Sequence, residues 1–295
     1  MTTFAPPPPV DPSTQPPPPL SPRRRTAIRV ALIVAATALV VGTVASLGGL
    51  AIGVSSFRVI TDSAPLPPTM RSLTVDTGSV PVAVRITADR EAREPRVDLR
   101  LVNSTRAGEN PLTVSTDAGV TLITLSGEGS SFLDWGRAGE LTLVLPPDLA
   151  RRLTVNTEQD NGVVLLNADV DQLIARTDNG EVVLGGSARR IEIYTENGDV
   201  VTRNPISVSE SLTAETSNGD VEVDLRDAAP RTVEASSDNG DVTVAVPAGG
   251  RFLVNADTEN GHTAIRVPRA TDRQSASAVI TVRSENGDVI VEELR

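Results

Sequence analysis

The sequence lacks cysteine and lysine, and its 295 residues include one histidine, one tryptophan and one tyrosine. The absence of cysteine excludes disulfides, thiol nucleophiles and thiolate metal sites. The absence of lysine excludes a Walker-type phosphate loop and Schiff-base chemistry. The single histidine, His262, excludes histidine-rich zinc sites, so any acid–base chemistry would depend on carboxylates.

Positive charge is scarce as well. The formal net charge is −11, and residues 69–295 alone carry −14, from 22 arginines and 36 acidic residues. Phosphate binding needs a basic surface, so we expect no nucleic-acid partner. No motif in the chain indicates a cofactor.

The N-terminal 57 residues divide into a tail and an apolar segment. Ten of the first 22 residues are proline, so residues 1–25 predict a disordered tail. Residues 26–57 predict a transmembrane helix, because the 28 residues 30–57 are uncharged and would span about 42 Å as a helix, against a hydrocarbon core of about 30 Å. A cleaved signal peptide is the alternative, although its apolar region is normally only about 7 to 15 residues.

The charges around this segment predict its orientation. Four arginines precede it and one follows it, which places the tail in the cytoplasm and the rest of the chain outside. Residues 58–68 contain three prolines and predict a stiff linker. Residues 69–295 then form an extracytoplasmic domain. The predicted location is the cell membrane, with a single pass.

An internal repeat marked by Asn-Gly runs through this domain. Chance predicts about one such pair for this composition, and the chain has seven. Gly119 marks a further, degenerate copy. The predicted structural turn residues are Asn161, Gly162, Asn179, Gly180, Asn197, Gly198, Asn218, Gly219, Asn239, Gly240, Asn260, Gly261, Asn286 and Gly287.

Apolar and polar residues alternate on both sides of each glycine, which is typical of strands with one buried face. The position seven residues before the glycine is apolar in all eight copies. Asn and Gly suit a tight reversal because they tolerate positive φ. A Ser or Thr stands three residues before the glycine in seven copies, where it is expected to bond local backbone groups.

The pattern predicts an all-β fold in which each repeat is a strand, a turn and a strand. Stacked hairpins or a sandwich are the alternative, but they need a second layer to cover the apolar face, and the sequence shows no amphipathic helix for this purpose. A two-sided solenoid covers its own core, and its coils stack about 4.8 Å apart. We therefore favour a β-solenoid-like repeat. The charged residues Glu292, Glu293 and Arg295 are expected to protect the last strand from end-to-end pairing.

The repeated units also resemble a known family. Units of the form [Thr/Ser]-x-Asn-Gly-Asp-Val occur at 195–200, 216–221 and 284–289, and Leu-Val-Leu-Pro precedes the array at 143–146. They resemble the bacterial adhesin-like β-strand-repeat family of unknown function, also called the Toastrack domain, over roughly residues 73–295. The resemblance implies an extracytoplasmic β-repeat, often on a membrane anchor and associated with envelope-stress systems, without established catalytic residues.

Acidic residues flank the turns, and those after the glycine include Asp199, Asp220, Asp241 and Asp288. In a stack they would form a row whose oxygens are candidate calcium ligands. The sequence lacks calcium β-roll and EF-hand spacing, so we expect solvated carboxylates and assign no metal or cofactor site.

Two further features bear on chemistry. Carboxylates alone could hydrolyse polysaccharide, but the domain has few aromatic residues to form a sugar-binding cleft, and His262 lies in a variable turn without a surrounding signature. Phe132 and Trp135 interrupt the repeat and predict either a packing loop or a ligand contact.

The sequence thus predicts a non-enzymatic, membrane-anchored binding, adhesin-like or structural module of the cell envelope. Its predicted partners are the membrane and an envelope polysaccharide or protein. The second hypothesis is an envelope-stress sensor or scaffold whose proline-rich tail binds a cytoplasmic partner. A polysaccharide-acting enzyme is the third.

Overall fold

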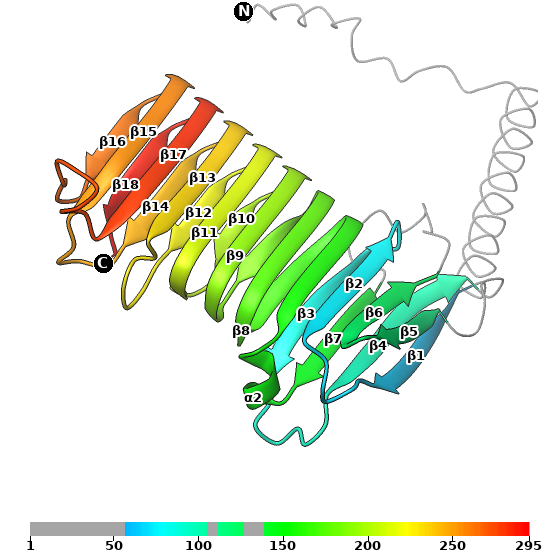
Figure 1. Cartoon of the computed structure of the whole chain (residues 1–295). Helices are drawn as coiled ribbons and strands as arrows, with labels where there is room; N and C mark the ends of the chain where they lie inside the picture. Colours follow the sequence, from blue (N-terminus) through cyan, green and yellow to red (C-terminus); the bar gives the residue numbers. More distant parts are fainter. Residues whose placement is uncertain (1–56, 105–110, 127–138, 295) are drawn as a thin grey trace, which may run out of the picture. The chain divides into compact units, whose positions relative to one another are not determined.

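The computed structural model describes residues 57–104, 111–126 and 139–294 (Figure 1). The predicted tail, and the predicted transmembrane segment up to residue 56, lie outside the described residues. Within the described part of the chain, no helix combines the length and the apolar character that a membrane span needs. Phe57–Arg295 forms one compact unit.

The described residues of this unit contain 18 strands and one short helix. The strands, in chain order, are β1 (Phe57–Pro65), β2 (Ser72–Gly78), β3 (Val82–Ala88), β4 (Arg96–Ser104), β5 (Leu112–Asp117), β6 (Val120–Leu125), β7 (Gly139–Leu145), β8 (Thr154–Leu184), β9 (Gly186–Asn197), β10 (Val200–Thr202), β11 (Ser207–Asn218), β12 (Val221–Asp224), β13 (Thr232–Asn239), β14 (Val242–Val246), β15 (Phe252–Asn260), β16 (Thr263–Arg266), β17 (Ala278–Asn286) and β18 (Val289–Glu293). The helix α2 (Pro147–Ala150) precedes β8.

Most strands pair in parallel with the equivalent strand of a neighbouring repeat. The strands before the turns form a first layer, in the order β5, β6, β2, β8, β9, β11, β13, β17 and β15. The strands after the turns form a second layer, in the order β1, β4, β7, β3, β8, β10, β12, β14, β18 and β16. The long strand β8 passes through two turns and so belongs to both layers. These parallel pairings confirm the all-β, solenoid-like prediction for the repeat array.

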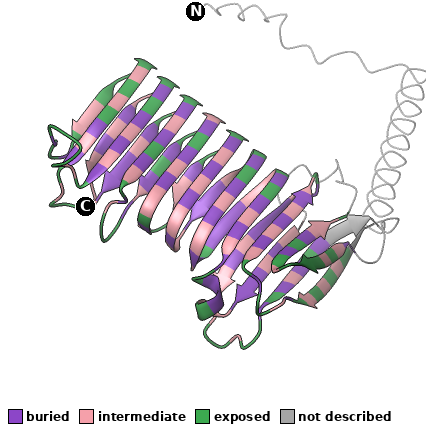
Figure 2. Ribbon diagram, in the orientation of Figure 1, coloured by how far each residue is buried: buried purple, intermediate pink, exposed green. Residues whose placement is uncertain are grey.

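The core lies between the two layers. Along each strand buried and exposed side chains alternate, so the buried positions form stripes across the stack (Figure 2). The residue two positions after the turn glycine is valine in six coils, and all six side chains are fully buried: Val164, Val182, Val200, Val221, Val242 and Val289. Aliphatic side chains, mainly valine, leucine, isoleucine and alanine, fill this core, and each packs against its equivalents in the coils above and below.

The spatial order of the last coils differs from their order in the chain. The C-terminal coil, β17 and β18, lies between the coil of β13 and β14 and the coil of β15 and β16 (Figure 1). The coil at residues 252–266 is therefore the end coil of the stack. The expectation that Glu292 and Glu293 protect a terminal strand is wrong, because β18 pairs on both sides and Glu292 accepts a hydrogen bond from Arg266 of the end coil at 2.9 Å.

Sequence features explain this order. In the end coil, the buried valine two residues after the glycine is replaced by Thr263, and the aspartate directly after the glycine is replaced by His262. Both side chains are exposed, because none of the described coils covers them. A coil with polar residues at these positions is suited to the end of a stack, whereas the valine-rich C-terminal coil is suited to the interior.

At the opposite end, antiparallel strands close both layers. β1 pairs with β4, β4 with β7, and β5 with β6. The prediction of a linker over 58–68 is therefore wrong for most of this range: its residues up to Pro65 belong to β1, an edge strand. Its prolines misled the prediction because proline is tolerated on edge strands and at their ends.

The degenerate copy at Gly119 is a hairpin rather than a coil. Ala118 and Gly119 have φ angles of 48° and 85°, and the strands that they join are antiparallel. Two consecutive residues at positive φ are typical of a two-residue hairpin turn. Conversely, β2 and β3 form a stacked coil that has no Asn-Gly pair, and the sequence pattern did not predict it.

Candidate functional site

The turn residues lie one above another along one edge of the stack. Five of the seven turn asparagines donate a hydrogen bond from Nδ2 to Oδ1 of the asparagine in the adjacent coil, over the pairs 197–179, 218–197, 239–218, 286–239 and 260–286, at 3.0 to 3.1 Å. We call this row the Asn ladder. Asn161 does not join it by a side-chain bond, and Asn179 instead donates to the carbonyl oxygen of Asp160 at 3.4 Å.

The turn glycines are required because neighbouring backbones approach closely. A Cβ atom at Gly198 would lie 1.8 Å from the carbonyl oxygen of Gly180, and the φ of Gly198 is +154°. A side chain would therefore collide with backbone and strain its own residue. The glycine of each unit is a condition for stacking as well as for turning.

The row of aspartates also connects adjacent coils. The backbone N–H of Asp220 donates to Oδ1 of Asp199 at 2.9 Å, and Asp241 and Asp288 repeat this bond to the coil below at 2.8 Å. At the end coil, the N–H of His262 donates to Oδ1 of Asp288 at 2.8 Å, which holds the pKa of that carboxyl below its usual range.

These bonds give the aspartates a structural role. Among the described residues, no group of three or more His, Asp or Glu side chains is arranged to hold a metal ion. The sequence predicts solvated carboxylates rather than calcium ligands at Asp199, Asp220, Asp241 and Asp288, and this stays a prediction. His262 occupies the aspartate position in the end coil. No further described coil lies beyond it to donate an N–H, so a carboxylate acceptor is not needed there.

The Ser and Thr side chains three residues before the glycines also connect coils. Thr216 Oγ1 donates to the carbonyl oxygen of Gly198 at 2.9 Å, and Ser237, Ser284 and Thr258 donate equivalent bonds at 2.8 to 2.9 Å. The expectation of bonds within the local turn is therefore wrong for these four residues. The acceptor belongs to the coil beneath, because the side chains point into the stack rather than along their own turn.

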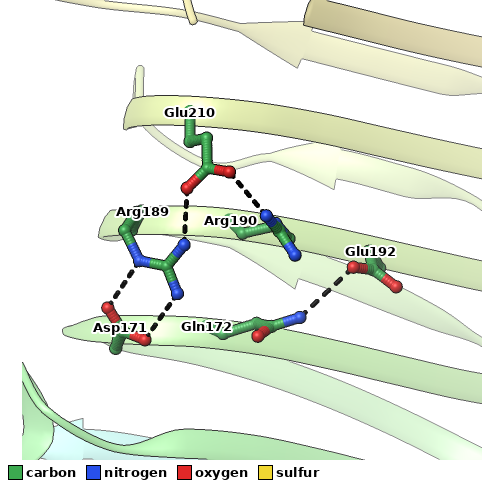
Figure 3. Close-up of polar contacts among 6 residues, drawn as sticks. All are labelled: Asp171, Gln172, Arg189, Arg190, Glu192 and Glu210. Atoms are coloured by element: carbon green, nitrogen blue, oxygen red, sulfur yellow. Dashed lines mark hydrogen bonds and ion pairs between the residues drawn. The ribbon is translucent and has the colours of Figure 1, made fainter.

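A charged network crosses three coils at the corner opposite the turns. Arg189 donates to Asp171 from Nε and Nη2, both at 2.9 Å, and to Glu210 from Nη1 (Figure 3). Glu210 accepts a second bond from Arg190. The arginine contacts hold the pKa values of Asp171 and Glu210 below their usual range, and the two carboxylates raise that of Arg189.

This network was not predicted. The sequence did contain a signal for it. The position nine residues before the turn glycine carries charges of alternating sign in three successive coils, at Asp171, Arg189 and Glu210. Beside it, Gln172 donates to Glu192 at 3.2 Å (Figure 3). The side chains of the network are 32 to 42% exposed, so we assign it mainly to fixing the register of the coils.

The outer face of the first layer carries a second group of side chains. The in-register row four residues before the glycines contains Arg176, Tyr194, Glu215, Ser236, Arg283 and Asp257. The Arg176 guanidinium carbon lies 5.4 Å from the centre of the Tyr194 ring, within the range of a cation–π contact. Burial, followed by the charges of Glu215 and Glu192, raises the pKa of Tyr194.

A row of carboxylates runs beside this one, directly before each turn asparagine. Its members are exposed: Asp160, Asp178, Glu196, Asp238, Glu285 and Glu259, with Ser217 at the remaining position. Shallow depressions on this face are lined by residues of both rows. We call the two rows together the first outer face. It presents aromatic, cationic and anionic groups on a flat, regularly spaced surface.

The outer face of the second layer differs in character. Ala83, Leu165 and Val183 form a separate apolar cluster and are only 4 to 7% exposed, with Val163 and Val201 packed beside them. The sequence pattern predicted polar residues at these outward positions. Phe132 and Trp135, predicted as a packing loop or ligand contact, lie outside the described residues.

Comparison with known proteins finds a family match over the repeat array. Residues 150–292 match the Toastrack DUF4097 family. The matched segment covers just under half of the chain and includes all seven Asn-Gly turns. It agrees with the resemblance that the repeated units indicate. No curated protein is significantly similar to the chain in sequence.

Solved structures with similar folds are more distant. A candidate adhesin from Bacteroides fragilis has a TM-score of 0.47 and 13% identity, covering 80% of this chain and 97% of that one. A candidate cell adhesion protein from Clostridium sporogenes has a TM-score of 0.39 and 10% identity, covering 80% and 100%. A candidate lipid binding protein from Parabacteroides distasonis has a TM-score of 0.42 and 11% identity, covering 80% and 97%.

Proposed function

We propose that this chain is a non-enzymatic, membrane-anchored binding module of the cell envelope and that the first outer face is its binding surface. Residues 26–56 would supply the single-pass anchor, because Phe57 already belongs to β1, with the proline-rich tail in the cytoplasm and the stack outside. The observation that supports the proposal is the regular presentation of Tyr194, Arg176 and the exposed carboxylates on a rigid layer. Binding surfaces of this kind recognise a partner by spacing and charge.

The chemistry of the face favours a protein partner with cationic side chains. Exposed carboxylates outnumber the two arginines of the face, and like charges oppose an anionic partner. Arg176 already lies over the Tyr194 ring, and this ring face is therefore not free to stack against a sugar. The Toastrack similarity supports a role without catalysis, because the family resemblance carries no catalytic residues.

The experiment is co-sedimentation of the full chain, in lipid nanodiscs, with four envelope fractions: peptidoglycan, wall polysaccharide, lipid vesicles and envelope proteins, each with and without Ca²⁺. The test variant is E196Q/E215Q on the first outer face. The matched control is E181Q/E222Q, which neutralises two carboxylates of the second layer. We expect saturable binding to the protein fraction that weakens at least tenfold in the test variant and less than twofold in the control.

Other outcomes contradict the proposal in identifiable ways. Saturable binding to polysaccharide that both variants retain would show that the ligand is a polysaccharide and that it binds outside the first outer face. Equal weakening by both variants would show a response to net charge only. Binding that requires Ca²⁺ and is abolished by D220N/D241N would assign the aspartate row a metal role instead.

A further inference from the structure

The C-terminal coil, residues 278–293, occupies a slot formed by two other coils of its own chain. On one side β17 and β18 pair with β13 and β14, and on the other side with β15 and β16. Residues 267–277 connect the end coil to the C-terminal coil, and most of their side chains are exposed. Because this exposed segment links the two coils, it can act as the hinge when the C-terminal coil enters or leaves the slot.

The bonds on the two sides of this coil are equivalent. Asn286 donates to Asn239 and accepts from Asn260, both at 3.0 Å. Asp288 donates its N–H to Asp241 and accepts from His262, both at 2.8 Å. The Asn ladder and the aspartate row therefore fix which residues lie above one another, but they do not distinguish the coil of one copy from that of another.

The order of synthesis makes an open slot a required stage of folding. Domains generally begin to fold from the N-terminal side during synthesis. The end coil, residues 252–266, is complete before residues 278–293 exist, yet the C-terminal coil must end up beneath it. The surface of β13 and β14 is therefore either uncovered or transiently covered by the end coil until the C-terminal coil enters.

We infer that the C-terminal coil exchanges between two copies of this chain, so that residues 278–293 of each copy fill the slot of the other. The exchanged dimer keeps the side-chain and backbone bonds of the slot, because the inserted coil is identical. The single copy has the advantage of its short connection, which gives an effective concentration on the order of millimolar. Exchange is thus a minor outcome at micromolar concentration and increases in proportion to concentration.

The absence of cysteine allows a direct test with disulfides. Ser236 of β13 and Arg283 of β17 are register partners on the outer face of the first layer. Full chains carrying only S236C are mixed in detergent with full chains carrying only R283C, unfolded, refolded together over a range of concentrations, and oxidised. We expect a disulfide-linked dimer on non-reducing gels, with a dimer-to-monomer ratio that rises about tenfold for each tenfold increase in concentration.

Matched pairs control for collision and for coil order. E215C with R283C joins positions two coils apart, which cannot form a disulfide in either arrangement. The double variant S236C/R283C in one chain is expected to form an internal disulfide. Should S236C prevent folding, T243C with I290C provides an equivalent pair in the second layer.

Two results would overturn the inference. One is an internal disulfide in S236C/R283C without an intermolecular product above the E215C control at any concentration, which would show insertion only within one chain. The other is an internal disulfide in S236C/D257C but not in S236C/R283C, which would show that the coils stack in chain order and that no slot exists.

Discussion

The two ends of the stack terminate the repeat array in different ways. At one end, β1, β4 and β5 turn antiparallel and close both layers with strands that follow no repeat. At the other end, a coil of the repeat itself terminates the array, with Thr263 and His262 in place of the usual valine and aspartate. The comparison shows that a repeat can be terminated either by a change in strand direction or by losing the residues that accept a further coil.

The interior coils differ from both ends because each must fit two neighbours. The turn glycine, the inward valine and the asparagine of an interior coil therefore each contact equivalent residues in two neighbouring coils. In the end coil the same positions contact only one neighbouring coil. The same substitution should therefore have different effects at an interior position and at its equivalent near an end.

The largest difference is expected between two glycines. In G219A the new Cβ would lie 2.3 Å from the carbonyl oxygen of Gly198, at a φ of +150°. We expect a loss of about 3 kcal/mol or more in the free energy of unfolding, because strain and a backbone collision combine. In G119A, at the hairpin of β5 and β6, the φ is +85° but no atom lies within 4 Å, so we expect a loss of only about 1 kcal/mol.

The measurement is urea denaturation of the full chain in detergent, with the two variants compared under identical conditions. Equal losses would contradict the close-approach argument, because φ alone would then determine the cost. The comparison therefore separates the turn geometry that the hairpin and the coil share from the stacking that only the coil requires.

The second comparison uses one column of inward side chains. Val242 and Thr263 are the register partners of Val289 on its two sides. V242T places an unpaired hydroxyl in the core and is expected to lower the free energy of unfolding by about 2 kcal/mol. T263V, at the exposed end, is expected to change it by less than about 0.5 kcal/mol. It is also expected to promote association, measured by light scattering, because the end coil becomes more like an interior one.

The same residues show which features of the fold and of the candidate site the sequence could predict. The Asn-Gly turns and the alternation predicted the layers and the inward positions, because both are local properties. The order of the last coils depends on which coils fit each other, and only Thr263 and His262 carried that information. The coil of β2 and β3 was missed because its turn lacks Asn-Gly, and the Arg176–Tyr194 contact was missed because it needs the register across 18 residues.

The third comparison concerns the Asn ladder. Asn218 donates to Asn197 and to the carbonyl oxygen of Glu196, and it accepts from Asn239. N218A therefore removes three hydrogen bonds at exposed positions, for an expected loss of about 1 to 2 kcal/mol. N260A removes the single bond to Asn286, so its loss is expected to be less than half as large. Chemical denaturation of both variants measures the ratio, and a larger effect at Asn260 would contradict the ladder as a source of stability.

The smallest expected effect is on the pH dependence of the free energy of unfolding. It is compared between carboxylates in the middle of the stack and one at its end. Arginine contacts hold the pKa values of Asp171 and Glu210 below their usual range, and a hydrogen bond from the backbone N–H of His262 does the same for the pKa of Asp288. A carboxyl whose pKa is lower in the folded chain contributes stability above its unfolded pKa of about 4 and loses it as the pH falls through the folded value. The free energy of unfolding is therefore expected to decrease from about pH 5 to pH 2.

E210Q is expected to flatten this decrease, because the glutamine no longer titrates while Arg189 and Arg190 lose their charged partner at every pH. D288N tests the end of the stack, where an asparagine oxygen can still accept the His262 amide, so the decrease is expected to flatten with little loss at neutral pH. E222Q, an exposed carboxylate of β12, is the control. If all three variants show the same pH profile as the parent chain, acid acts through net charge, and the coils at the middle and the end are held together by packing and backbone bonds alone.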